Sequence, residues 1–145
     1  MRGALLLLLA ACDDPCKRGS EPTFELGVGA TTFTQVSDGD DAHLVFGPQG
    51  GYHIDLAVKT TYLDLDDLFA GTIEGVVDGS RHFYATPWFA AECIDDTQIA
   101  TGVRMFLETT PADVIGHTVV VDAEISDIHG TSLADGFSLT VQAPL

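Results

Sequence analysis

The chain has 145 residues, of which six are lysine or arginine and 22 are aspartate or glutamate, so its formal net charge is −16 at pH 7. A molecule this acidic repels phosphate backbones and anionic lipid headgroups, so we expect no nucleic-acid partner and no electrostatic adsorption to membranes. The acidity fits a solvated surface, and the alternative is capture of cations or basic partners. The length suits one domain with its own core.

The first residues have the pattern of a secretory signal. Arg2 supplies a basic start, residues 4–11 form a short apolar run, and small residues precede Cys12. The run is too short to span a bilayer. The Leu-Ala-Ala-Cys sequence that ends at Cys12 resembles the lipobox of bacterial lipoproteins.

This resemblance implies removal of residues 1–11, acylation of Cys12, and attachment of the mature protein to a membrane through its lipid. More than one acyl chain gives stable attachment. The expected location is therefore the cell envelope, on a periplasmic or cell-surface face, with the leaflet left open. The alternative is a secreted protein cleaved at Ala10-Ala11, in which Cys12 keeps its thiol.

Cleavage before Cys12 leaves 134 residues with a net charge of about −17, because five basic residues then face 22 acidic ones. Residues 12–23, which are polar and lack apolar periodicity, are expected to form a short tether, and residues 24–145 the domain. If lipid takes Cys12, then Cys16 and Cys93 remain as an even pair, and we expect a structural disulfide between them. Two unpaired thiols or an intermolecular link are the alternatives.

Beyond the tether the dominant pattern is period-two alternation rich in Val, Ile, Thr, Phe and Tyr, which predicts β-strands. The clearest stretches are residues 52–62, 101–109, 117–125 and 137–141. Shorter candidates are residues 24–29, 33–36, 42–46, 72–77 and 81–86, with turns expected at 38–39, 47–51, 78–79 and 129–130.

The alternation also predicts which side chains face the core. In residues 52–62 one face carries Ile54, Leu56 and Val58, and the opposite, outward face carries His53, Asp55, Ala57 and Lys59. Further inward positions are Val103, Met105, Leu107, Val119, Val121, Ala123, Ile125, Phe137, Leu139 and Val141. Many short strands of this kind predict an all-β fold of two packed sheets.

Residues 111–116 (Pro-Ala-Asp-Val-Ile-Gly), a long alternating strand, residues 126–130 (Ser-Asp-Ile-His-Gly) and a last strand resemble the closing part of bacterial immunoglobulin-like domains, over about 35 residues. The resemblance implies an immunoglobulin-like antiparallel β-sandwich of about seven to nine strands. Residues 47–53 (Gly-Pro-Gln-Gly-Gly-Tyr-His) resemble a loop of uncharacterised bacterial envelope lipoproteins. The candidate binding loop within it consists of Gln49, Gly50, Gly51, Tyr52 and His53.

Two histidines flank this loop. His43 and His53 together with Asp41 or Asp55 have the donor types of a zinc or copper site. Surface or hydrogen-bonded histidines explain the same pattern without a metal. Cys93 is not followed by the closely spaced His and Met of a cupredoxin-like copper site.

Acidic clusters offer oxygen ligands for calcium. One cluster contains Asp38, Asp40 and Asp41, and another contains Asp64, Asp66 and Asp67. Neither has EF-hand spacing, and Asp and Gly also form turns for local reasons. We therefore expect no cofactor, with His43, His53, Asp38 and Asp40 kept as candidate ligands.

The sequence holds no nucleophile elbow, zinc-protease, Walker or dinucleotide-binding motif. Ser80, Arg81 and His82 follow an Asp-Gly turn and predict a hairpin. Near Cys93, Tyr84, Trp88 and Phe89 surround Pro87, as part of the core or of a binding face.

The function expected is therefore that of a noncatalytic binding or interaction module of the cell envelope, with a protein or glycan partner. A metal-binding envelope protein using calcium, zinc or copper is the alternative, and a small hydrolase is a third possibility.

Overall fold

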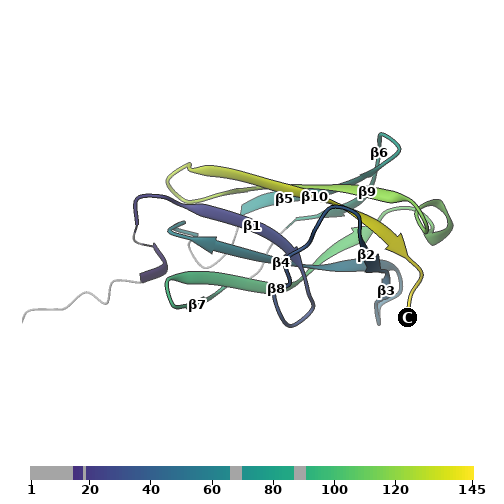
Figure 1. Ribbon diagram of the computed structural model, residues 1–145, viewed down its shortest axis with the longest axis horizontal. Helices are drawn as coiled ribbons and strands as arrows, with labels where there is room; N and C mark the ends of the chain where they lie inside the picture. The colour runs from purple at the N-terminus through teal and green to yellow at the C-terminus, as the bar shows by residue number, and fades with distance from the viewer. Residues whose placement is uncertain (1–14, 18, 66–69, 87–90) are drawn as a thin grey trace, which may run out of the picture.

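A computed structural model describes residues 15–17, 19–65, 70–86 and 91–145 (Figure 1). These residues form two short 3-10 helices and ten strands, and they include no α-helix. The helices are η1 (Pro15–Lys17) and η2 (Pro111–Asp113). The strands are β1 (Thr23–Val28), β2 (Asp40–His43), β3 (Val45–Phe46), β4 (Tyr52–Thr61), β5 (Ala70–Val77), β6 (Ser80–Ala85), β7 (Glu92–Ile94), β8 (Thr97–Leu107), β9 (Thr118–Ser126) and β10 (Ser132–Gln142).

The strands belong to one curled, mixed sheet. Their order is β1-β4-β8-β6-β5-β9-β10-β2, with β3 paired to β4 and β7 to β8. The sheet folds over, so that β4 and β8 lie in one layer and β5, β9 and β10 in the other (Figure 1). At the bend, β6 and β8 share only the pairs Phe83↔Leu107 and Tyr84↔Phe106. The all-β prediction is confirmed, but that of a wholly antiparallel sheet is wrong at one place, because β2 runs parallel to β10.

The core lies between the two layers, and β9 shows why the alternation forms it. Residues of β9 are alternately exposed and buried along the strand. The predicted inward residues of β9 and β10 are all buried: Val119, Val121, Ala123, Ile125, Phe137, Leu139 and Val141. Each branched or aromatic side chain removed from water stabilises the fold by about 1.5 to 3 kcal/mol before entropy is counted.

The predicted faces of β4 are only partly right. Ile54, Leu56 and Val58 are buried as expected, but Ala57 and His53 are buried too. Ala57 loses its exposure because residues 29–34 fold over the outer face: a Cβ on Gly27, the cross-strand neighbour of Ala57, would lie within 3 Å of the Phe33 ring. For the same reason residues 33–36 form no strand, and only Thr34 makes an isolated bridge, to Val28.

A β-bulge accompanies this covering segment. Leu56 pairs with Val103 and Ala57 with Thr101, which leaves Gly102 as the extra residue of β8. Its φ of +68° lies in the left-handed region, where glycine has no steric penalty. The Gly102 N–H donates to the Gly29 carbonyl oxygen at 2.9 Å. The bulge thus attaches the covering segment to the sheet.

The chain changes layers between β2 and β3. β2 pairs with β10, whereas β3 pairs with β4 in the other layer. Between them Leu44 is buried, and its N–H donates to the Gln142 carbonyl at 3.1 Å. The single strand predicted over residues 42–46 is therefore two strands, and β7 is a strand that the alternation did not predict.

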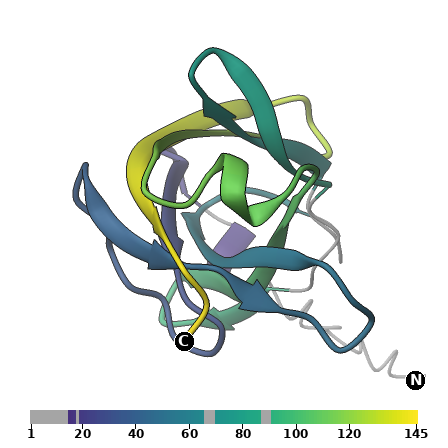
Figure 2. The ribbon, with the colours of Figure 1, turned by 90° about the vertical axis from the view of Figure 1, so that its right-hand side faces the viewer.

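The two ends of the long axis differ. One end, the tether pole, carries η1 and the turn at residues 95–96 (Figure 1). The other end, the C-terminal pole, carries β3, the loop of residues 47–51 and the chain's last residues. Figure 2 views the C-terminal pole end-on, with η2 near the centre.

Candidate binding surface

The glycine-rich loop is a tight connection between β3 and β4. The Gly50 N–H donates to the Gly47 carbonyl, and the Gly47 N–H to the Gly51 carbonyl, both at 3.0 Å. Gly50 and Gly51 have φ values of +84° and +93°, so glycine is needed at both positions. Gln49 and both of these glycines are exposed, and the turn predicted at residues 47–51 is confirmed.

The loop is flanked by aromatic rings. The rings of Phe46 and Tyr52 lie 5.2 Å apart between centroids, tilted by 60°. Tyr52 packs against the core, while Phe46 is 62% exposed. Phe46, directly before the loop, is therefore an exposed aromatic side chain at the C-terminal pole.

His53 lies on the outer face of β4, as the alternation predicts, but it is not an exposed ligand. It is only 4% exposed, and its Nε2 lies 3.3 Å from Oδ1 of Asp55. Its ring centroid lies 6.0 Å from that of Phe106, and a Cβ on Gly47 would come within 3.7 Å of the ring. The loop and Phe106 thus cover the His53 ring, and the Asp55 carboxylate is the partner of its Nε2.

The other histidines are dispersed and are held by separate partners. His43 Nδ1 lies 2.8 Å from the Ala143 carbonyl, His117 Nδ1 3.2 Å from Asp78 Oδ2, and His129 Nε2 3.1 Å from Asp64 Oδ2. The backbone carbonyl of His82 accepts from the Glu108 N–H at 2.8 Å. Across the ranges that the structure describes, no group of three or more His, Cys, Asp or Glu side chains could hold a metal ion.

The three aspartates at the turn before β2 and in β2 accept hydrogen bonds from other residues of the protein. Asp38 Oδ1 accepts hydrogen bonds from the Ser138 N–H at 2.7 Å and from its hydroxyl at 3.1 Å. Asp40 Oδ2 accepts from the Ser37 N–H, and Asp41 Oδ1 from Gln142 Nε2. The Asp38 and Asp41 carboxylates thus fix β2 beside β10, and the Asp40 carboxylate holds the turn before β2. These separate hydrogen bonds account for the acidic cluster without calcium. Of the second cluster, Asp66 and Asp67 lie outside the described residues.

The tether pole is cross-linked. Cys16 in η1 and Cys93 in β7 form the expected disulfide, with a Cα–Cα distance of 5.9 Å. Beside it, Lys17 Nζ lies 3.1 Å from Asp64 Oδ1, and the Ile128 N–H donates to the Asp64 carbonyl. The hydrogen bond from Lys17 is the main cause that lowers the pKa of the Asp64 carboxyl below its ordinary value. Four segments that are distant in sequence therefore meet at this pole: η1, β7 and the segments that contain Asp64 and Ile128.

Ser80 and Arg81 follow the turn at residues 78–79 and begin β6, as predicted for a hairpin. Arg81 forms ion pairs with Glu74 at 3.2 Å and Glu108 at 2.9 Å, and these hydrogen bonds raise its pKa above the ordinary value. Its guanidinium carbon lies 4.8 Å from the Tyr84 ring centroid. Arg81 thus links Glu74 in β5 with Glu108, which follows β8, in one cluster of charged side chains.

The sequence alone did not single out Phe46 or Phe106, which is 54% exposed, or Val45, which is 39% exposed. Phe106 could have been found, because it falls between the inward positions Met105 and Leu107. Cys12, Pro87, Trp88 and Phe89 lie outside the described residues. In the part of the chain that the structure describes, no helix is long and apolar enough to cross a membrane.

Comparisons with protein-family models, with curated proteins and with solved structures found no match.

Proposed function

We propose that the protein is a lipid-anchored, noncatalytic binding module of the cell envelope, acylated at Cys12 and presenting its C-terminal pole to a partner. The observation that carries this proposal is the disulfide between Cys16 and Cys93, which attaches the tether at the pole opposite the exposed aromatic side chains. Cys12 is four residues before Cys16, a span of at most about 14 Å in extended chain. A lipid at Cys12 would therefore keep the tether pole close to the membrane.

The C-terminal pole would then face away from the bilayer. It carries Phe46, Val45 and Phe106, whose exposed apolar surface suits contact with an envelope protein or glycan. Functional loops on a rigid β scaffold commonly gather at one end of a domain. The acidic surface would keep the module from adsorbing to anionic headgroups.

The strand order supports the further proposal that the curled sheet is a variant of the immunoglobulin-like sandwich. Taken in chain order without the short strands β2, β3 and β7, seven strands remain. The first, second, fifth and fourth lie side by side (β1-β4-β8-β6), and so do the third, sixth and seventh (β5-β9-β10). This strand order corresponds to the ABED and CFG sheets of immunoglobulin domains, except that the β5–β6 hairpin joins the two sets of strands here, and the correspondence supports the proposal. Fold likeness alone does not assign a function.

Mass spectrometry of the mature N-terminus tests lipid attachment. Protein from the membrane fraction should begin at Cys12 and carry the mass of acyl chains, and Cys12→Ser should move the protein out of that fraction. Asp13→Asn is the matched control and should remain acylated. An unmodified N-terminus, or a Cys12→Ser protein that stays in the membrane fraction, would overturn the proposal.

A further inference from the structure

A row of side chains, one from each of six neighbouring strands, runs across the outer face of the sheet. It begins at Val45, beside the glycine-rich loop, and ends at Asp122 in β9. Direct register pairs join its members: Val45↔His53, His53↔Phe106, Phe106↔Tyr84, Tyr84↔Glu74 and Glu74↔Asp122. Directly opposed residues of antiparallel strands point to the same side of the sheet. Their chain neighbours Ile54, Met105, Phe83, Ile73 and Val121 are buried, so the row faces outward. We call these residues the outer strip: Val45, His53, Phe106, Tyr84, Glu74 and Asp122.

The outer strip changes chemistry along its length. Its first half is apolar and aromatic, with Phe106 more than half exposed above the covered His53. Its second half is acidic and borders a surface hollow of about 380 Å³ whose lining includes Glu74, Asp122 and Glu124. An apolar end therefore continues into an anionic end.

We propose that the outer strip is a docking site for an extended polypeptide segment of another protein, with apolar side chains in one half and lysine or arginine in the other. The inference deepens the proposed function and rests on it for the location of the partner. Charge complementarity supports this occupant: the protein's net charge of −16 repels a second copy of itself, nucleic acid and anionic lipid alike.

Within the protein, the cationic side chain of Arg81 already contacts two residues of the strip, Tyr84 and Glu74. Arg81 lies 4.8 Å from the Tyr84 ring and pairs with Glu74 and Glu108. A guanidinium over an aromatic ring beside carboxylates is a favourable arrangement. Basic side chains of the partner would extend it toward Asp122 and the hollow.

The size of the strip sets the length of the segment. Its six strands are separated by five spacings of about 4.8 Å, so the strip is about 24 Å long measured along the sheet, which bends between β8 and β6. This is the contour length of about seven residues in extended conformation. A segment of this length can place an apolar residue on Phe106 and a basic residue near Asp122 at the same time.

An NMR titration of the full-length chain carrying Cys12→Ser tests the proposal. The probe is a seven-residue amidated peptide with leucines in one half and lysines in the other, and the comparison peptide carries glutamates in place of the lysines. The lysine peptide should shift the amide signals of β4, β8, β6 and β5 beside the strip, and the glutamate peptide should not. No shift with either peptide, or shifts confined to other parts of the surface, would overturn the proposal.

Two variants and their controls separate the strip from general acidity. Phe106→Ser should weaken binding by about tenfold, the effect of losing one half-exposed aromatic contact, whereas Ile128→Ser, an exposed apolar position at the other pole, should not. Glu74→Gln with Asp122→Asn should weaken it by about threefold to tenfold. Equal weakening by the control pair Glu92→Gln with Asp96→Asn would mean diffuse attraction and contradict the strip.

Thermal unfolding of each variant verifies that it is folded before binding is compared. Because the titration uses Cys12→Ser protein, its failure removes the strip as a docking site and leaves lipid attachment to be decided by the mass of the N-terminus.

Discussion

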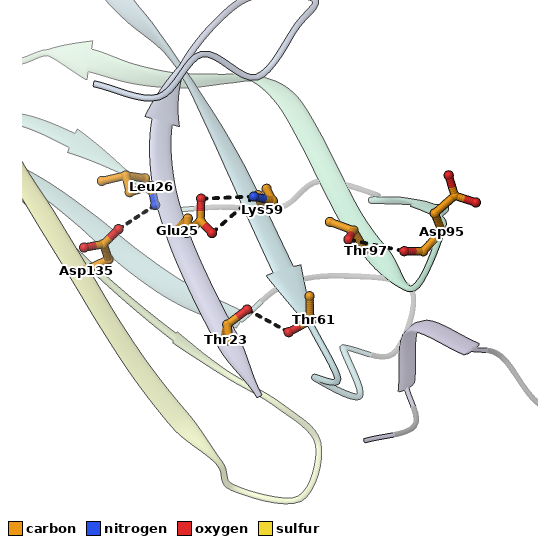
Figure 3. A network of polar contacts seen from close by, with 8 residues as sticks. All are labelled: Thr23, Glu25, Leu26, Lys59, Thr61, Asp95, Thr97 and Asp135. Atoms are coloured by element: carbon orange, nitrogen blue, oxygen red, sulfur yellow. Dashed lines mark hydrogen bonds and ion pairs between the residues drawn. The ribbon is translucent and has the colours of Figure 1, made fainter. Parts of the chain in front are cut away.

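Oδ2 of Asp135 in β10 accepts a 2.7 Å hydrogen bond from the backbone N–H of Leu26 in β1, across a seam where the two strands form no ladder (Figure 3). On its other side β1 pairs with β4, supported by Thr23–Thr61 and Glu25–Lys59 contacts. β1 is an edge strand, and the Asp135 carboxylate accepts the hydrogen bond from one of its backbone N–H groups. Without this acceptor, the N–H group could pair with a strand of another molecule. The seam closes the curled sheet without a further ladder.

Asp135→Ala should destabilise the protein, because it leaves the Leu26 N–H without its acceptor in a partly buried position. Hydrogen bonds to charged groups contribute about 1.5 to 3 kcal/mol, and we expect a loss of that size in urea unfolding. Asp135→Asn keeps an oxygen acceptor and should lose less. Hydrogen exchange at Leu26 should be faster in the alanine variant; an unchanged rate and unchanged stability would show that the seam bond contributes nothing.

The disulfide should be the largest single contribution to stability among the contacts of the tether pole. It closes a loop with a sequence separation of 77 residues. Chain entropy then predicts a loss of about 4 kcal/mol on reduction or in the Cys16→Ala, Cys93→Ser double variant. Urea unfolding with and without a reductant measures this difference. The double variant should be insensitive to the reductant, and a wild-type loss below about 1 kcal/mol would contradict the entropic estimate.

The acid cluster at the β2 turn should be structural and independent of calcium. Asp38→Ala removes the acceptor of two Ser138 hydrogen bonds and should lower the unfolding free energy by about 1 to 3 kcal/mol. The loss should be the same in EDTA and in excess calcium. A calcium site would instead stabilise the wild type by about 2.7 kcal/mol at a hundred times its dissociation constant, an increase that Asp38→Ala would abolish.

Asp64 should make stability depend on acid pH. Its pKa lies below the ordinary 3.8, chiefly through the hydrogen bond from Lys17, against which partial burial acts. Because the folded pKa is lower than the unfolded one, its stabilisation is present above about pH 4 and is lost as the pH falls through the folded value. The melting-temperature difference between wild type and Asp64→Asn should therefore shrink from pH 6 to pH 2. The exposed Asp96→Asn serves as the control, and a difference for Asp64→Asn that is constant with pH would refute this role.

Alternation along the chain predicted the core faces of β9 and β10, since burial on one side of a strand directly requires period two. It failed where another segment covers the outer face. Ala57 and His53 occupy outward positions by parity, but Phe33 packs near Ala57 and Phe106 packs near His53. Both of these covering residues are distant in sequence from the residues that they cover. The parallel pairing of β2 with β10 has no local sequence pattern either.

The candidate site was predicted in part. The loop of residues 47–51 was predicted from its glycines, and two of them need a positive φ. The exposed apolar side chains beside the loop were not predicted, because Phe106 and Val45 come together only through the register of their strands with β4. The pairing of Cys16 with Cys93 followed from counting the cysteines and assigning Cys12 to lipid, which needs no geometry.

Energy transfer in lipid vesicles tests most directly the claim that a lipid at Cys12 holds the tether pole near the membrane. A fluorescent residue would be placed at Ile128 near the tether pole or at Gln49 at the C-terminal pole of the acylated protein, with acceptor dye on lipid headgroups. We expect clear transfer from position 128 and much weaker transfer from position 49. Equal transfer from both positions, or stronger transfer from position 49, would contradict it.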